Sequence, residues 1–410
     1  MLISMAWRNL WRNRRRSILS MAAIAFAEML LLFVMNFQQG SYKDMISNVL
    51  KIHTGAIQVQ MKGYQKEQDV NLAFGGADEI MSKMRAMDSV TGVTARAEAP
   101  ALVSMKDRTF GAMIFGIDPG NEAKVTTLHE VVREGAYLED GDTKGALVGK
   151  LLAKNLGIKV GDEIAFLGQA TQGGFAPGLV TVRGIFSLGQ KELDANTMFI
   201  NINMMDQAYE LNGRVHRIVA QVGKISKIPA ILKETKTLLK SENRSKLVAL
   251  DWGEVSPDMK QMIDMDWNTA QIFYWILLLV VGFGIMNTFL MSFLERIREF
   301  GVMMSIGMRP WKVSQLVFVE ALMLTVVGIV VGVILGAAVT IYFQVVGIDM
   351  GQSAAELYAE YGMSSIIHPI WVTWVAIYSA VAVLFIGVLA AVYPAWKVTK
   401  LRPVEAVRYL

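Results

Sequence analysis

Four long apolar runs constrain what this sequence can fold into more than any other feature. They cover residues 18–39, 267–294, 313–346 and 371–393. Each run is long enough to cross a hydrocarbon core of roughly 30 Å as a helix. Because 53% of the 410 residues are hydrophobic, the chain is predicted to be an integral membrane protein with four transmembrane α-helices.

Basic residues are distributed unevenly around these runs. Five arginines precede the first run, four basic residues lie within 295–312, and four follow the last run. Between Lys312 and Lys397 there is no lysine or arginine. Cytoplasmic segments of membrane proteins carry an excess of Lys and Arg. We therefore expect both termini, segment 295–312 and the tail 394–410 to be cytoplasmic, and segments 40–266 and 347–370 to lie on the other side.

The first 17 residues are predicted to form an amphipathic helix on the cytoplasmic membrane surface. Trp7, Leu10 and Trp11 recur at helical spacing with arginines on the other side, which is typical of interfacial helices; a plain topology signal is the alternative. The first apolar run continues beyond a potential signal-cleavage site at Ala27, so we expect an uncleaved anchor. Segment 40–266 then faces the periplasm from a bacterial inner membrane, with a cell-surface domain as the alternative. Without cysteines it has no disulfides.

Segment 40–266 mixes strand and helix periodicities and is predicted to be a large α+β domain. Apolar and polar residues alternate at 55–61, 163–167 and 215–222, as in strands, whereas 78–88, 147–157 and 228–240 have helical spacing. Residues 131–214 are richer in strands and glycine, so we expect a second lobe there and a first lobe formed by 40–130 with 215–266.

Segment 169–180 (QATQGGFAPGLV) is rich in glycine and free of charge. It has two interpretations. One is a plain hairpin loop between two strands. The other is an exposed apolar hook, with Phe175 and Pro177 near its tip, that captures a partner protein, since loops often carry recognition.

Small and acidic residues interrupt the apolar runs at a few positions. Gly328, Gly332 and Gly336 recur every four residues, which predicts a ridge where another helix packs closely, within this chain or in a second membrane subunit. Glu320 lies near the basic segment and is expected to pair or to reach the inner surface. Glu28 lies deeper, where an ionisable group is costly, and its role stays open.

Segment 295–312 (ERIREFGVMMSIGMRPWK) is predicted to continue the second run as a charged and then apolar helix. Gly307 and Pro310 are expected to end it. A short amphipathic helix of this kind suits insertion into a groove of a partner protein.

No catalytic motif accompanies these features. The segment from Gly145 to Lys150 does not match a phosphate-binding loop, and the four histidines are dispersed without metal-ligand spacing. The 26 methionines are interpreted as adaptable packing residues rather than as a copper site. We expect no catalytic residues, no metal and no nucleic-acid partner.

Three segments carry a resemblance to a known family. ERIREFGVMMSIGMRPWKVSQLVFVEAL, the tail YPAWKVTKLRPVEAVRYL and the start AWRNLWRNRRRSILS resemble the signatures of FtsX-like permeases of ABC transporters. The four-span layout is similar to the permeases of macrolide exporters and of lipoprotein-releasing (Lol-type) systems. GAIQVQMKGYQ and KNLGIKVGDEIAF favour the lipoprotein-releasing branch.

The resemblance implies a fold and a set of partners. The two lobes would be Porter-like and Sabre-like subdomains, and segment 295–308 would be a coupling helix that docks in a cytoplasmic ABC ATPase. That ATPase would be a separate subunit binding ATP and Mg, while this chain would bind no cofactor and catalyse nothing. The permease would work as a dimer with a second copy or a paralogue. The implied ATPase-coupling residues are Glu295, Arg296, Arg298, Glu299, Phe300 and Met303.

The main functional hypothesis is extraction of lipoproteins, or similar amphiphiles, from the outer leaflet by a mechanotransmission mechanism. The outer half of the second span, including Phe273, Ile276 and Leu277, is the expected cargo cavity, and the hook would bind a periplasmic lipoprotein chaperone. Alternatives are a drug or peptide efflux permease of a tripartite pump, and a non-transporting regulator of periplasmic cell-wall hydrolases.

Overall fold

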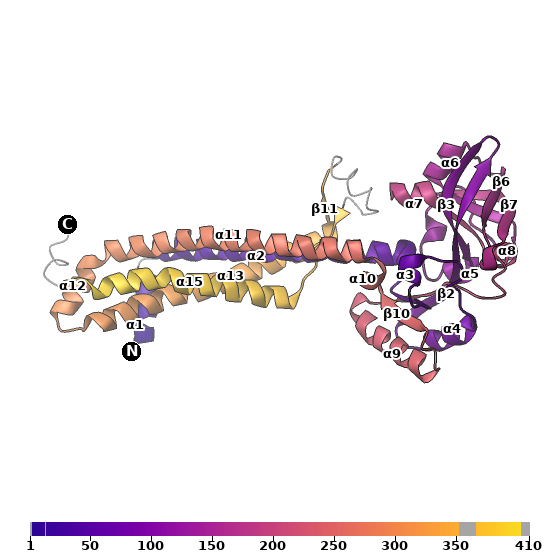
Figure 1. Ribbon diagram of the computed structural model, residues 1–410. Helices are drawn as coiled ribbons and strands as arrows, with labels where there is room; N and C mark the ends of the chain where they lie inside the picture. Colours follow the sequence, from indigo (N-terminus) through magenta and orange to yellow (C-terminus); the bar gives the residue numbers. More distant parts are fainter. Residues whose placement is uncertain (1, 13, 352–365, 403–410) are drawn as a thin grey trace. The chain divides into compact units, whose positions relative to one another are not determined.

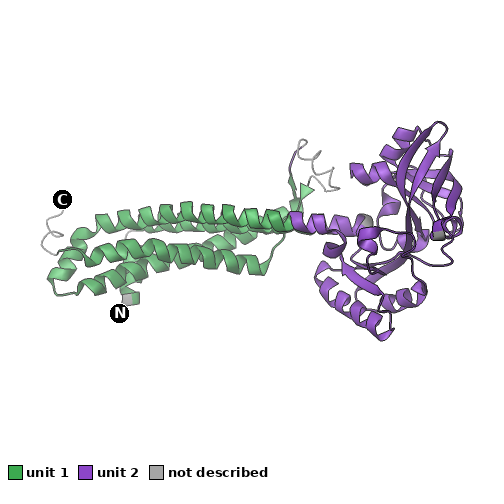
Figure 2. Cartoon of the chain, viewed as in Figure 1, with its two compact units in different colours: residues 1–43, 263–349, 366–410 green, residues 44–262, 350–365 purple. Residues whose placement is uncertain are grey.

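The computed structural model describes residues 2–12, 14–351 and 366–402. These divide into two compact units (Figure 2). The helical unit comprises Met1–Lys43, Ile263–Asp349 and Ile366–Leu410, and the α/β unit comprises Asp44–Met262 and Met350–Ser365. Most of the predicted segment 347–370 and the end of the tail 394–410 lie outside the described residues.

The helical unit is built from long apolar helices that lie side by side (Figure 1). Four helices of the described chain are long and apolar enough to cross a membrane, with mean hydropathies of 2.2 to 2.7, which confirms the predicted four-helix membrane fold. Their bounds, with those of two shorter helices and a two-stranded sheet, are α1 (Leu2–Arg12), α2 (Arg14–Val49), α11 (Pro257–Glu295), α12 (Ile297–Ser305), α13 (Pro310–Val346), α15 (Thr373–Thr399), β11 (Ile348–Asp349) and β12 (Ile366–Ile367).

The core of the helical unit is apolar and is filled mainly from four helices. Leu32 and Met35 of α2, Leu278 of α11 and Val383 of α15 are among its most buried side chains. Much of the remaining apolar surface of these helices is exposed, as expected for helices that face lipid tails.

The α/β unit contains a ten-stranded sheet in the order β10-β1-β9-β2-β3-β8-β5-β7-β4, with β6 paired to β2 and β7. Most pairs are antiparallel, but β3 pairs with β8 and β5 with β7 in parallel. The strands are β1 (Ile57–Met61), β2 (Val90–Met105), β3 (Arg108–Ile117), β4 (Val132–Gly135), β5 (Gly145–Gly149), β6 (Glu163–Gln169), β7 (Phe175–Phe186), β8 (Thr197–Asn201), β9 (Arg217–Val222) and β10 (Leu247–Asp251).

Eight α-helices accompany this sheet in the described part of the α/β unit, in addition to the ends of α2 and α11. They are α3 (Tyr64–Glu67), α4 (Ala77–Arg85), α5 (Pro119–Glu122), α6 (Lys150–Leu156), α7 (Lys191–Asn196), α8 (Ile202–Tyr209), α9 (Ile228–Ser241) and α10 (Trp252–Val255). The strands predicted at 55–61, 163–167 and 215–222 and the helices at 78–88 and 228–240 are confirmed to within a few residues.

The helix predicted at 147–157 is wrong at its start. Residues Gly145–Gly149 form β5, which is fully buried between β7 and β8, and the helix α6 begins only at Lys150. Leu147 and Val148 fit a helical period as well as a buried strand, so spacing alone did not separate the two. The predicted stop at Gly157 is confirmed, because this residue has a φ of +74° that favours glycine.

Three apolar cores lie in the α/β unit, and they do not divide at residue 131 as predicted. The first core combines 50–95 with 215–249, the second runs from 97 to 211 with Val70 and Ala73, and a smaller third core draws on residues between 115 and 199. The strand β2 has 16 residues and contributes to the first and second cores. The predicted boundary therefore lies inside the second core, because a single long strand continues from the first core into the second.

Candidate coupling site

The segment after α11 is a separate helix rather than a continuation of it. At Arg296 the backbone leaves helical geometry, with φ −109° and ψ 8°, and α12 then runs from Ile297 to Ser305. Gly307 has a φ of +104° that lets the chain reverse. Pro310 was expected to end this element, but it occupies the first turn of α13, a position that proline favours because it needs no N–H donor there.

One face of α12 is packed into the helical unit. Ile297, Phe300 and Met304 recur at helical spacing and are buried. They pack in a cluster with residues of α11, α13 and α15, namely Phe293, Val313, Val317 and Val398. Motion of α12 would therefore be transmitted to α11, α13 and α15, because close-packed side chains cannot move independently.

The opposite face of α12 is exposed in the described part of the chain. Arg298 is exposed, Val302 is 44% exposed and Ile306 is 82% exposed. We call these three residues the α12 outer face. Two exposed aliphatic side chains beside a cation are suited to docking in a groove of another protein.

A buried ion pair joins the start of α12 to α13. The guanidinium of Arg296 donates two hydrogen bonds to the carboxylate of Glu320, and both side chains are about 9% exposed. Asn9 of α1 donates a third hydrogen bond to the same carboxylate, over 2.6 Å. Arg296 also donates to Glu299 over 3.0 Å. Pairing and hydrogen bonding offset the cost of burying these charges.

Two arginines near the N-terminus complete this network. Arg12 at the end of α1 pairs with Glu299, and Arg16 in the first turn of α2 pairs with Glu295 over 3.0 Å. We call the seven residues the α12 ion network; they are Asn9, Arg12, Arg16, Glu295, Arg296, Glu299 and Glu320.

The six residues proposed from the sequence as coupling residues separate into two groups. Arg298 is exposed and Met303 is half-buried. Glu295, Arg296 and Glu299 are engaged within the chain, and Phe300 is only 1% exposed with the Arg296 guanidinium 5.1 Å from its ring centre. Arg296 and Phe300 thus hold α12 in place and present little surface to a partner protein.

Sequence reasoning missed Asn9, and it assigned Arg12 and Arg16 only to lipid contact and topology. One signal was present: Arg12 and Arg16 are four residues apart, and so are Glu295 and Glu299. That match of spacing was insufficient on its own, because nothing in the sequence shows that the two segments meet.

The glycine ridge of α13 packs against α2 of the same chain. A Cβ added at Gly328 would lie 2.7 Å from the Cβ of Ile24, and one at Gly332 would lie 2.6 Å from the Cβ of Glu28. At Gly336 the nearest atom would be a methyl of Leu32, at 2.8 Å. Each distance is too short for a real side chain, so the ridge lets the two helices approach closely.

Adding one methyl group to this ridge is expected to destabilise the helical unit. In Gly332→Ala the new Cβ would also lie 2.7 Å from the backbone oxygen of Ala25, so the backbones must separate, at a cost of about 1–3 kcal/mol. Thermal unfolding of the variant in detergent measures this loss of stability. Gly284→Ala is the matched control, because a Cβ at Gly284 meets nothing within 4 Å; equal melting temperatures for the two variants would contradict the packing.

Glu28 is fully buried at the same helix contact. One carboxyl oxygen accepts a hydrogen bond from the hydroxyl of Ser379 on α15 over 2.7 Å, and the other has no partner in the described chain. The carboxyl group therefore links α2 to α15 beside Gly332.

Two of the three predicted cargo residues lie on an open face of α11 in the single chain. Phe273 and Ile276 of α11 are 65% and 54% exposed, and Val280 and Phe283 extend the same apolar face along the helix. Leu277 is different, because it is half-buried and packs against the core of the helical unit.

The glycine-rich segment 169–180 is a tight hairpin rather than a long loop. Strand β6 continues to Gln169 and β7 begins at Phe175, so only residues 170–174 turn. Pro177 was expected near a loop tip, but it is paired with Leu167 inside the β6–β7 ladder. Phe175 stands at the end of the ladder and is 83% exposed.

Next to this hairpin lies an exposed apolar sheet surface. Leu102 of β2 pairs with Leu167 of β6, which in turn pairs with Pro177 of β7. Leu102 and Leu167 are 53% and 44% exposed, and Leu179 is exposed two residues further along β7. Together with Phe175 these residues form what we call the apolar sheet face, the kind of patch that marks an interaction site.

The α/β unit also holds a buried charge cluster that the sequence did not reveal. Arg96 pairs with Glu122, and both side chains are 1% exposed. Nearby, Arg217 pairs with Glu98 over 3.2 Å. His216 is fully buried in the same cluster; its Nδ1 accepts the N–H of Glu98, and its Nε2 lies 2.9 Å from the oxygen of Val70.

His216 is expected to make the α/β unit sensitive to acid. Burial lowers its pKa below the usual value, so the folded state binds this proton less readily than the unfolded state, which binds it near pH 6.5. The contribution of His216 to the free energy of unfolding is then fully present above about pH 6.5. It is lost as the pH decreases, by up to about 1.4 kcal/mol per pH unit. Thermal unfolding at several pH values should show a shallower acid slope in His216→Gln; equal slopes would assign the effect to other groups.

No group of three or more His, Cys, Asp or Glu side chains in the described residues could hold a metal ion.

The geometry defines a membrane protein with four apolar helices, a large α/β unit inserted after the first of them, and a small helix held between the second and third. Family comparisons agree with this architecture. The family described as "MacB-like periplasmic core domain" matches residues 17–238, and the family described as "FtsX-like permease C-terminal" matches residues 271–403. The chain belongs to this family of FtsX-like and MacB-like ABC transporter permeases.

Relatives of named function are similar to this chain at low identity. A lipoprotein-releasing system transmembrane protein, LolC of Xylella fastidiosa, is 24% identical over 330 residues, which is 78% of each chain. The macrolide export ATP-binding/permease protein MacB of Neisseria gonorrhoeae is 22% identical over 96% of this chain and 58% of its own. The periplasmic region of MacB from Actinobacillus actinomycetemcomitans superposes with a TM-score of 0.38 and 13% identity, over 54% of this chain and 97% of that one.

Proposed function

We propose that this chain is the permease subunit of a mechanotransmission ABC transporter that extracts lipoproteins, or similar amphiphiles, from the outer leaflet of the bacterial inner membrane. The observation that carries the proposal is α12, a separate helix with one face locked into the helical unit and one face free. Family membership supports a transport role, and the lipoprotein-releasing relative supports the cargo.

In this proposal both chain termini and α12 are cytoplasmic, and the α/β unit is periplasmic. The clustering of basic residues beside α12 and at both ends of the chain supports this orientation. A separate ABC ATPase, which binds ATP and Mg, docks on the α12 outer face. A second copy of the chain or a paralogue completes the transporter, as in many assemblies built on two-fold symmetry.

Side-chain contacts would transmit a force applied to α12 directly to the spanning helices. The Arg296–Glu320 pair and the apolar contacts of Phe300 link α12 to α13. The glycine ridge then links α13 to α2. Both α2 and α11 remain helical across residues 43/44 and 262/263, where the chain passes from one unit to the other.

Extraction of a lipid-anchored protein from a bilayer requires both a source of free energy and an apolar surface that receives the acyl chains. Each acyl CH₂ moved from lipid toward water costs about 0.8 kcal/mol. The exposed face of α11, with Phe273 and Ile276, is the proposed cargo surface, facing its counterpart across the permease pair. The apolar sheet face with Phe175 is the proposed dock for a periplasmic lipoprotein chaperone, since it is uncharged and exposed.

Efflux of a drug or peptide is the second candidate function. The observation in its favour is the match of more than half of the chain to the MacB-like periplasmic core domain. In that case the α/β unit would contact an outer-membrane partner, and the cargo would not need an acyl chain.

Reconstitution separates these two candidates. The permease and its cognate ATPase are placed in liposomes with a fluorescent triacylated lipoprotein, and transfer to a soluble acceptor is followed with and without ATP. The expected result is ATP-dependent release of the triacylated protein and none of a matched protein without acyl chains. ATPase activity that is intact while no lipoprotein is released would reject lipoprotein as the cargo.

A further inference from the structure

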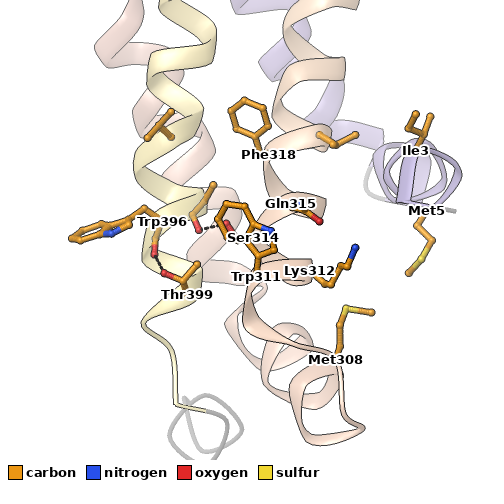
Figure 3. A pocket seen from close by; sticks show the side chains of 13 residues that line it. Ile3, Met5, Met308, Trp311, Lys312, Ser314, Gln315, Phe318, Trp396 and Thr399 are labelled. Atoms are coloured by element: carbon orange, nitrogen blue, oxygen red, sulfur yellow. Dashed lines mark hydrogen bonds between the residues drawn. The ribbon is translucent and has the colours of Figure 1, made fainter.

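A groove opens beside α1 at the end of the helical unit that carries α12 (Figure 3). It lies between α1, the first turns of α13 and the last turns of α15, and its volume is about 1340 Å³. The side chains that give it its character are Met5, Trp311, Lys312, Gln315, Phe318 and Trp396. None of the residues used for the proposed ATPase dock or cargo surface lines it.

The groove is polar at one end and apolar at the other. Figure 3 shows Lys312 and Thr399 toward one end and Phe318 toward the other, with Gln315 between them. Val319 and Val392 extend the apolar part. Among the described residues that line the groove there is no Asp or Glu, so its electrostatic character is set by Lys312.

The polar groups that line the groove differ in their partners. The side-chain oxygen of Gln315 is buried, accepts no hydrogen bond from the described residues and presents no surface to the groove. Lys312 takes part in none of the ion pairs within the described parts of the chain. Ser314 and Thr399 donate their hydroxyls to backbone oxygens of α15. The groove therefore offers one cation to a molecule from outside.

The surroundings of the groove are those of a membrane–water boundary. Trp311 and Trp396 are 64% and 51% exposed, and indoles prefer that depth in a bilayer. Lys400 lies with its Nζ 4.0 Å from the ring centre of Trp396, and Lys397 lies 5.9 Å from that of Tyr393. Basic pockets between spanning helices at this depth suit anionic headgroups.

We infer that this groove binds one anionic phospholipid of the surrounding bilayer. The phosphate lies at Lys312, and an acyl chain follows Phe318, Val319 and Val392. A phospholipid suits the site better than a protein segment does, because the cationic end and the apolar end of one groove match the two ends of one lipid. The bound lipid would fill the space between α1 and α13, next to the α12 ion network.

The test uses the full chain in nanodiscs of mixed phosphatidylcholine and phosphatidylglycerol, without ATPase. Native mass spectrometry measures which lipid is retained and how tightly. Phosphatidylglycerol is expected to be retained in preference, with affinity reduced about tenfold in Lys312→Gln. Arg309→Gln is the matched control, because Arg309 is exposed, lies three residues away and does not line the groove; it is expected to retain the lipid. Melting temperatures of both variants check the fold.

Several results would overturn the inference. Equal loss of lipid in Lys312→Gln and Arg309→Gln would indicate diffuse attraction to the basic surface, and equal retention of phosphatidylcholine would indicate ordinary boundary lipid. Displacement by inorganic phosphate would indicate a phosphate site instead of a lipid site.

A photo-crosslinking amino acid in place of Trp311 tests the occupant in native membranes. The expected adduct is a phospholipid. An adduct with the ATPase or with a second copy of the chain would show that a protein covers this groove, which would also overturn the inference. Because this experiment requires no transport, its outcome is independent of the proposed lipoprotein cargo.

Discussion

Ile306→Asp is expected to abolish docking of the partner ATPase while leaving the permease folded. Ile306 is 82% exposed at the end of α12, so a carboxylate there changes the folding free energy by less than about 0.5 kcal/mol. In the complex the same carboxylate would be buried in an apolar groove. Loss of a central interface contact of this kind typically costs about 2–4 kcal/mol of binding free energy, which is roughly a 30-fold to 1000-fold loss of affinity.

Co-purification with the ATPase and permease-stimulated ATP hydrolysis would measure this loss. Ile306→Leu is the conservative control and is expected to retain binding. Trp374→Asp introduces the same charge at another half-exposed apolar residue, at the start of α15, and is expected to leave docking unchanged. Undiminished ATPase binding by Ile306→Asp would remove the α12 outer face from the interface.

Glu122→Ala is expected to cause the largest loss of stability in the α/β unit. Glu122 accepts two hydrogen bonds from Arg96, over 2.6 and 3.1 Å, and one from Thr126 over 2.8 Å. Without this carboxylate the Arg96 guanidinium is buried with its main counter-charge removed. Breaking a buried pair in this way costs about 3–5 kcal/mol.

Thermal and chemical unfolding of the full chain would measure the loss. In the double variant Arg96→Met/Glu122→Leu both charges are replaced by apolar groups, and the expected loss is smaller than for Glu122→Ala alone. Glu79→Gln is the surface control, because its pair with Lys83 is exposed and its removal is expected to leave the melting temperature unchanged. A double variant less stable than the single variant would show that the charges themselves are favourable.

Local patterns were enough to predict the membrane helices and several elements of the α/β unit. A run of about 20 apolar residues has few alternatives to a spanning helix, and every predicted span lies in or within two residues of α2, α11, α13 or α15. The ridge at Gly328, Gly332 and Gly336 is predictable for the same reason, since only glycine leaves room for another backbone. The partner helix was not predictable, because spacing on one helix contains no information about which neighbour faces it.

The position of the α12 helix was predicted from the sequence, but its contacts within the chain were predicted only in part. Amphipathic spacing located α12, whereas the break at Arg296 depends on where Phe300 and Glu320 lie in the packed chain. Similarly, β5 was taken for the start of a helix, because Leu147 and Val148 fit both periods until β7 and β8 enclose them.

The sequence by itself determined the membrane class, the number of spanning helices and the position of the α12 helix, since these follow from hydrophobicity and periodicity along a short stretch. The tertiary structure alone decided how the charges pair. Arg12 meets Glu299 from 287 residues away and Arg96 meets Glu122 in a core, while Lys312 is left facing a groove formed by three distant helices. The physical reason is that burial and pairing energies depend on distances in space, which a linear pattern does not contain.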